Sequence, residues 1–79
     1  MEGTVETVNP FQKLLRERLA ELGISRSELA RRLGIWHSTL RPWVEGQGLP
    51  MEKHLGCLAR VLDVPEGEVR RAWEEAKRD

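Results

Sequence analysis

Apolar residues recur at helical spacing in several separate stretches of the chain, and residues that begin or end helices bound each stretch. The first stretch has this spacing over one helical face: Phe11, Leu14, Leu15, Leu19 and Leu22. Asn9 suits the N-cap before it, and Pro10 suits the first helical position. Gln12, three residues after the cap, is expected to complete a capping box. Gly23 is expected to end the helix, because glycine tolerates a positive φ.

A second, shorter stretch repeats this arrangement. Ser25 is expected to cap it, with Glu28 three residues further on. Its apolar face is short: Leu29, Ala30 and Leu33. Gly34 is expected to end the helix in a tight turn, and Ile35 is expected to point inward from that turn. A helix, a Gly-centred turn and a second short helix together form a helix-turn-helix arrangement.

The third helix is predicted from about residue 37 to residue 45, and its start is unusual. Trp36 stands where a small polar cap would be expected, and its side chain has no oxygen to accept a hydrogen bond. In the preferred interpretation Ser38 takes over as the cap, which places Pro42 in the first turn, where a missing N–H costs least. In the other interpretation the helix begins near His37 and Pro42 kinks it.

Two further helices are predicted in the rest of the chain. The fourth has one apolar face and ends near Asp63: Met51, Leu55, Leu58, Ala59 and Leu62. Pro65 can open the fifth, whose apolar stripe is Val69, Ala72, Trp73 and Ala76. No stretch alternates as a strand would. The predicted fold class is therefore all-α, a compact five-helix bundle that contains a helix-turn-helix.

The domain organisation follows from the same pattern. Residues 1–8 have no apolar periodicity and are predicted to form a disordered N-terminal arm. Residues 9–79 are predicted to form a single helix-turn-helix domain. The sequence predicts neither a membrane span nor a signal peptide, and a single cysteine favours a reducing, cytoplasmic location.

The balance of charged side chains adds little to the prediction of function. Thirteen basic side chains balance thirteen acidic ones, which argues mildly against strong non-specific binding of nucleic acid. Residues 10–46, however, hold seven basic and four acidic side chains. The small positive excess therefore falls on the predicted helix-turn-helix, although ordinary solvated helix faces explain it equally well.

The candidate chemistry for an enzyme is absent from the sequence. His54 and Cys57 are three residues apart on a predicted helix, but no other cysteine is available, so neither a metal site nor a cofactor is expected. Cys57 is instead expected to be a small buried hydrophobe. The sequence has no nucleophile–base set and no phosphate-binding Gly motif, so the chain is not expected to be an enzyme.

The motif S-x-x-E-L-A-x-x-L-G-I at residues 25–35, followed by S-T-L, W and G-x-x-x-P, resembles the lambda-repressor-like, Cro-type (XRE) helix-turn-helix family. L-x-x-L-A-x-x-L-D-V at residues 55–64 is similar to the fourth helix of that family, and the resemblance covers about residues 11–69. It implies a compact bundle of five helices that binds double-stranded DNA, often as a homodimer, and usually regulates transcription.

The resemblance also implies roles for individual residues. Arg26, at the start of the second helix, occupies a position that commonly contacts a DNA phosphate. His37, Ser38, Thr39 and Arg41 occupy the outward positions of the recognition helix, and the Arg41 guanidinium suits the O6 and N7 atoms of guanine. Gln47 is a candidate phosphate donor in the following loop.

The sequence alone allows more than one interpretation for several of these positions. Trp36 is expected either to contact DNA or a protein partner, or to be partly buried. Arg31 and Arg32 either face phosphates or are merely solvated. Glu45 would repel a phosphate unless it is paired. Trp43 is expected in the core. Val69 and Trp73 either belong to the core or extend a stripe across a dimer interface.

The leading hypothesis is a sequence-specific DNA-binding transcriptional regulator, either phage-repressor-like or autoregulatory. The alternative is a protein-interaction module on the same fold, the partner of a transcription or toxin protein, with weak or no DNA binding. Near-neutral charge and the residues Trp36, Pro42 and Glu45 favour this alternative.

Overall fold

The computed structural model describes residues 8–78 and folds them into helices alone. Its α-helices are α1 (Pro10–Leu22), α2 (Arg26–Leu33), α3 (His37–Glu45), α4 (Leu55–Leu62) and α5 (Glu66–Arg78), and a short 3-10 helix, η1 (Glu52–His54), precedes α4. Within residues 8–78 no residue lies in a strand, so the predicted all-α class with five α-helices is confirmed. Residues 1–7 of the predicted N-terminal arm lie outside the described residues.

The caps of α1 agree with the sequence prediction in part. The Asn9 side chain accepts a hydrogen bond from the Gln12 backbone N–H at 2.7 Å, and Gly23 ends the helix at φ 68°. The predicted return bond from the Gln12 side chain to Asn9 is wrong. Gln12 is only 4% exposed, and its Oε1 atom is buried without a hydrogen-bond partner. The side chain reaches instead toward Gly46 at the end of α3.

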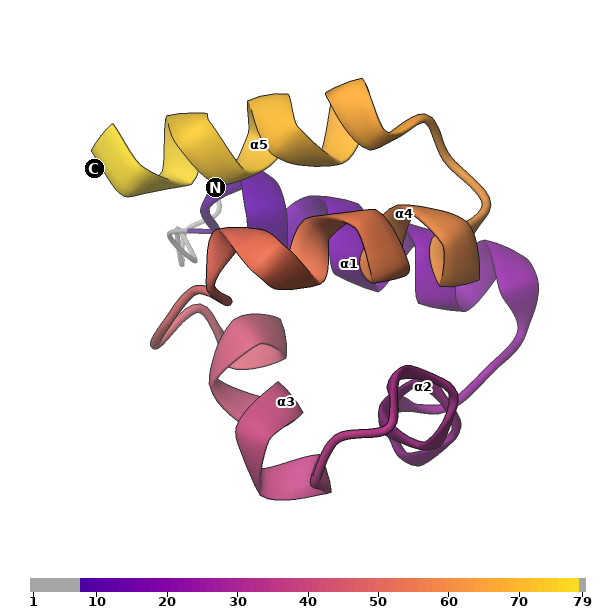
Figure 1. The fold of residues 1–79 in the computed structure, drawn as a ribbon. Coiled ribbons are helices and arrows are strands. Elements are labelled where there is room, and N and C mark those ends of the chain that lie inside the picture. Colours follow the sequence, from indigo (N-terminus) through magenta and orange to yellow (C-terminus); the bar gives the residue numbers. More distant parts are fainter. Residues whose placement is uncertain (1–7, 79) are drawn as a thin grey trace, which may run out of the picture.

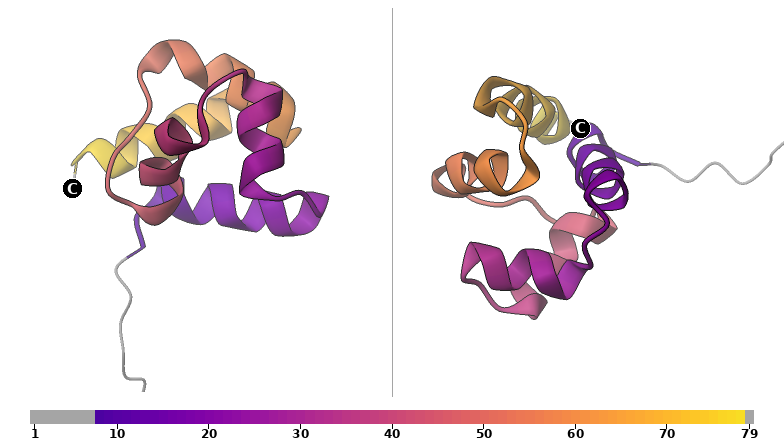
Figure 2. Two further views of the ribbon diagram at one scale, coloured as in Figure 1. Left: turned by 90° about the horizontal axis from the view of Figure 1, so that it is seen from below. Right: turned by 90° about the vertical axis from the view of Figure 1, so that its right-hand side faces the viewer.

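The helices pack in two groups around one core. Helices α1, α4 and α5 contact one another, whereas α2 and α3 pair on the side away from α5 (Figures 1 and 2). α3 packs on α1, and α2 packs on α4. The core takes buried apolar side chains from all five α-helices: Phe11, Leu15, Leu19, Leu29, Ala30, Leu40, Trp43, Val44, Leu55, Leu58, Ala59, Leu62, Val69, Trp73 and Ala76. The prediction that Trp43 lies in the core is thereby confirmed.

Two predictions for the fourth helix are wrong. Met51 lies before η1 and is exposed, because α4 begins only at Leu55. Cys57 is exposed rather than buried. Two residues along a helix rotate a side chain by about 200°, so Cys57 points away from the core face on which Leu55 lies.

Val69 and Trp73 are core residues of a single chain. Both are buried among the apolar side chains of that core. Neither residue therefore offers much surface to a second copy, and the interpretation of this stripe as a dimer interface gives way to the core interpretation.

Among residues 8–78 no helix is long and apolar enough to cross a membrane.

Candidate nucleic-acid interface

The turn between α2 and α3 forms as the Gly-centred pattern predicts. The Ser25 hydroxyl accepts a hydrogen bond from the Glu28 backbone N–H at 3.1 Å, which caps α2. Gly34 ends the helix at φ 73°, a left-handed conformation that strains other residues. The Ile35 N–H then donates to the Ala30 oxygen at 3.1 Å, and the Ile35 side chain packs against the core. The turn thereby fixes where α3 starts.

The start of α3 corrects the preferred sequence interpretation. Trp36 is the N-cap residue, with an extended backbone and no side-chain cap. Its carbonyl accepts hydrogen bonds from Thr39 and Leu40 at 3.0 and 3.2 Å, so the first turn is already formed and Ser38 lies inside the helix. Pro42 is consequently beyond the first turn. Its missing N–H leaves the Ser38 carbonyl without its usual helical donor.

The outward face of α3 is polar and open. His37, Ser38, Thr39 and Arg41 are all exposed, whereas Leu40, Trp43 and Val44 on the opposite face are buried. The side chain of Trp36 is 81% exposed at the beginning of this face, so the interpretation in which it is partly buried is wrong. The face combines hydrogen-bonding groups, one guanidinium and one large aromatic ring.

Glu45 links the two arginines to which the sequence assigns contact with DNA. One of its oxygens, Oε2, lies 3.0 Å from Nε of Arg41 and 3.7 Å from Nη1 of Arg26. Arg41 is one helical turn before Glu45 on α3, whereas Arg26 comes from the first turn of α2. The Glu45 carboxylate is therefore paired, and the two arginines with a predicted role in DNA contact share it.

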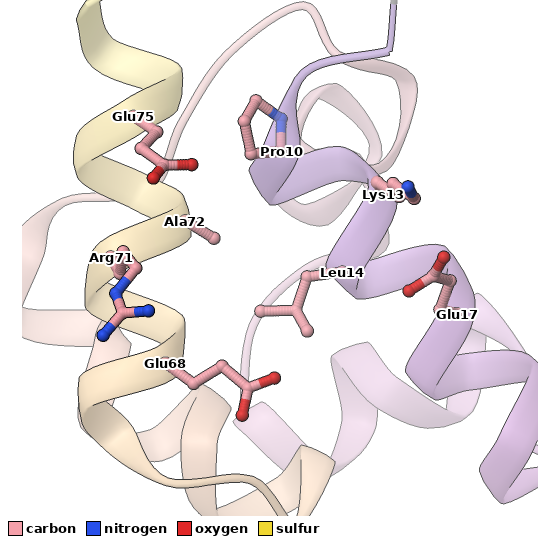
Figure 3. A pocket seen from close by; sticks show the side chains of 8 residues that line it. All are labelled: Pro10, Lys13, Leu14, Glu17, Glu68, Arg71, Ala72 and Glu75. Carbon is pink, nitrogen blue, oxygen red and sulfur yellow. The ribbon is translucent and has the colours of Figure 1, made fainter.

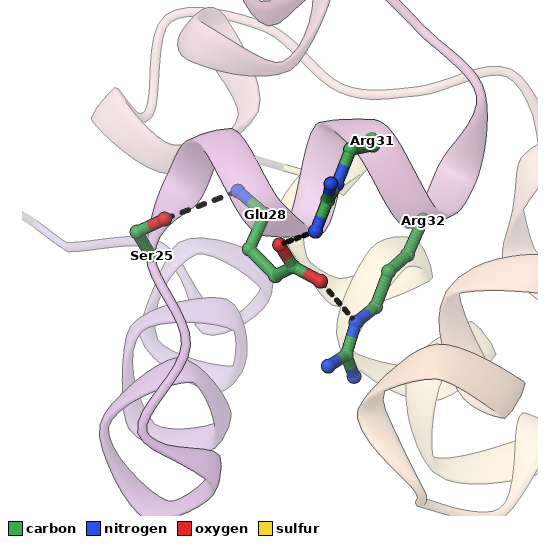
Figure 4. A network of polar contacts seen from close by, with 4 residues as sticks. All are labelled: Ser25, Glu28, Arg31 and Arg32. Carbon is green, nitrogen blue, oxygen red and sulfur yellow. Dashed lines mark hydrogen bonds and ion pairs between the residues drawn. The ribbon is translucent and has the colours of Figure 1, made fainter.

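Arg31 and Arg32 pair with a different carboxylate. Figure 4 shows Glu28 contacting Arg31 through one oxygen and Arg32 through the other, the latter at 2.8 Å, while its backbone N–H bonds Ser25. The hydrogen bonds from Arg32 and then Arg31 lower the pKa of the Glu28 carboxyl below its ordinary value of 4.5. These pairs join side chains of α2 to one another and share no residue with the ion pairs of Glu45.

Gln47 follows α3 in an exposed loop. Gly46 ends the helix at φ 80°, and the Gln47 N–H donates to the Pro42 oxygen at 2.8 Å. This bond fixes the backbone of Gln47 just beyond the end of α3, and its side chain is exposed. The position is compatible with the predicted phosphate contact.

A cavity of about 220 Å³ lies between α1 and α5, and Figure 3 shows the side chains around it. Leu14 and Ala72 face each other across it, and charged side chains such as Lys13, Glu17 and Glu68 surround them. No residue of α2 or α3 lines this cavity. It is therefore separate from the α3 face and contributes nothing to the candidate interface.

Within residues 8–78 no group of three or more histidine, cysteine, aspartate or glutamate side chains is placed to hold a metal ion.

A comparison with curated proteins finds no match. A family model described as Helix-turn-helix matches residues 15–69, which include all of α2, α3 and α4. Proteins of this helix-turn-helix family are DNA-binding regulators and typically have no enzymatic activity. The chain therefore belongs to the lambda-repressor-like, XRE-type helix-turn-helix family.

Proposed function

We propose that this protein is a sequence-specific transcriptional regulator that inserts α3 into the major groove of double-stranded DNA. One observation carries the proposal: α3 buries one face on the core and exposes His37, Ser38, Thr39 and Arg41 on the other. A helix fits the major groove, which is about 12 Å wide, and base edges there differ for every base pair. The exposed groups are donors and acceptors suited to such edges.

Each residue of the interface has a distinct part in this proposal. Arg41 donates to guanine, while Ser38, Thr39 and His37 contact neighbouring bases or phosphates. Arg26 and the Gln47 side chain contact the phosphate backbone and position the helix, because phosphate contacts carry little sequence information. Trp36 packs against sugars or thymine methyl groups at the beginning of α3.

The proposal includes a homodimer that acts in the cytoplasm, as a repressor or an autoregulator. Two copies would place their recognition helices in half-sites about 34 Å apart, one turn of DNA. Because Val69 and Trp73 are buried, other residues would have to form the dimer contact. Sedimentation with and without DNA would measure the stoichiometry.

Selection from random-sequence DNA tests the proposal, because it measures binding and returns the preferred site. The salt dependence gives a second measure. About four phosphate contacts per subunit would give a slope of log affinity against log salt near −7 for a dimer. Absence of binding at low salt, or a slope near zero, would contradict the proposal.

A protein-interaction module on the same fold is the second candidate, and the exposure of Trp36 favours it. Large exposed aromatic rings are enriched at protein interfaces, and Glu45 places a carboxylate on the same surface. A Trp36→Ala variant that keeps its affinity for DNA but loses a protein partner would support this candidate.

A further inference from the structure

The Glu45 carboxylate pairs with only one part of the Arg41 guanidinium group. Oε2 of Glu45 accepts a hydrogen bond from the Nε–H of Arg41. The two residues lie one turn apart on α3. Within residues 8–78 the hydrogen bond and the ion pair of Arg41 both run through Nε, and its terminal nitrogens Nη1 and Nη2 make no hydrogen bond. Those two nitrogens form the donor fork that matches O6 and N7 of guanine.

An ion pair at Nε therefore orients the fork without occupying it. A free arginine side chain loses rotamer freedom when it is fixed, and a partner on its own helix imposes part of that loss before DNA binds. The Glu45 side chain is 29% exposed, so its charge is partly shielded from water and the pair is less screened than a fully solvated one.

The same carboxylate acts against contacts with phosphate. It lies 3.7 Å from Nη1 of Arg26, the residue proposed to contact the DNA backbone. A phosphate that approaches Arg26 competes with the Glu45 carboxylate for the guanidinium group and is repelled by the charge of that carboxylate. Non-specific binding depends almost wholly on such phosphate contacts, so Glu45 weakens it more than it weakens binding to a site with the preferred guanine.

We propose that Glu45 is a positioning and specificity-determining residue of the DNA-reading surface. It holds Arg41 by Nε with its fork open to guanine, and it opposes binding that uses phosphates alone. This inference rests on the proposed function of α3.

The test is a Glu45→Gln variant, which removes the charge and keeps the shape. The matched control is Glu74→Gln on α5, which removes the same charge from a residue exposed on a helix outside the candidate interface. Affinity would be measured over a range of salt for the selected site and for random-sequence DNA. Thermal unfolding of each variant checks that the fold is unchanged.

Glu45→Gln is expected to bind random DNA about 3- to 30-fold more tightly than the wild type, the range expected for loss of two partly exposed ion pairs. Its salt slope should steepen by about 0.9 per subunit if one more phosphate is contacted. The ratio of specific to random affinity should fall by about 5-fold or more, since one oriented guanine contact is weakened. In an Arg41→Ala background, the change in this ratio should disappear.

Two other outcomes have separate meanings. If the wild type binds its selected site but Glu45→Gln and Glu74→Gln behave alike, the role of Glu45 is overturned and the proposed function stands. If the wild type and every variant fail to bind DNA at about 50 mM salt, where phosphate contacts are strong, the proposed function fails first and the role of Glu45 fails with it.

Discussion

The indole Nε1–H of Trp73 donates a hydrogen bond of 2.8 Å to the backbone oxygen of Pro50. This bond ties α5 to the loop that leads from α3 to η1. Arg70 on α5 reinforces the link through an ion pair of 2.6 Å with Glu52. Helix α5 thus holds the segment that follows α3, as well as packing on α1 and α4.

Replacing Trp73 by Phe should lower the free energy of unfolding by about 2–3 kcal/mol, since it removes a buried donor and some core volume. Urea denaturation would measure the loss. Trp36→Phe is the matched control, because that ring is exposed, and it should change stability by less than about 0.5 kcal/mol. Equal losses in the two variants would refute the role given to the bond with Pro50.

Gly46→Ala should be more damaging than Gly23→Ala. Both glycines have a positive φ, so either alanine is strained by about 1–2 kcal/mol. A Cβ at Gly46 would also clash with Oε1 of the buried Gln12 side chain, whereas nothing lies within 4 Å of a Cβ at Gly23. Adding Gln12→Ala should relieve part of the extra loss in Gly46→Ala. Urea titrations that gave the same loss at both glycines would contradict this account.

Pro42→Ala should stabilise the protein. The proline lies inside α3 and offers no N–H to the Ser38 carbonyl, and a proline within a helix is less favourable than alanine by up to about 3 kcal/mol. A gain of about 1–3 kcal/mol is expected by urea denaturation, reduced by the greater freedom of the unfolded alanine chain. A loss of stability would mean that packing of the proline ring outweighs the missing hydrogen bond.

Glu28 should make stability depend on pH. Its folded-state pKa is lowered by Arg32 and Arg31, so the unfolded state binds the proton more readily. The stability from this carboxylate is fully present above its ordinary pKa of 4.5 and is lost as the pH falls through the lower folded pKa. The difference between wild type and Glu28→Gln should therefore shrink below about pH 4.5. A difference that stayed constant from neutral pH down to pH 3 would disprove this coupling.

Much of the fold could be predicted because its signals are local. Asn9 and Ser25 cap their helices, and Gly23 and Gly34 end them, through residues only a few positions apart. Trp36 shows the limit of such reasoning. Its backbone alone starts α3, because the turn after Gly34 and the buried face of α3 fix that start without a side-chain cap.

The candidate site was predictable as a set of exposed residues but not as a set of contacts. The pair between Arg41 and Glu45 follows from a spacing of four on one helix. The contact between Arg26 and Glu45 joins two helices and depends on how α2 crosses α3, which no local pattern contains. The burial of Val69 and Trp73 likewise depends on which neighbours cover α5.

If α3 reads bases while Arg26 contacts the phosphate backbone, Arg26→Ala and Arg41→Ala should change the DNA preference in different ways. Each variant would be put through selection from random-sequence DNA beside the wild type. Arg41→Ala should lose discrimination at one base pair per half-site, worth about 1–3 kcal/mol, while Arg26→Ala should weaken binding to all sequences alike and keep the same preferred site. If both variants weakened binding to every sequence equally and left the selected site unchanged, the assignment of base reading to α3 would be contradicted.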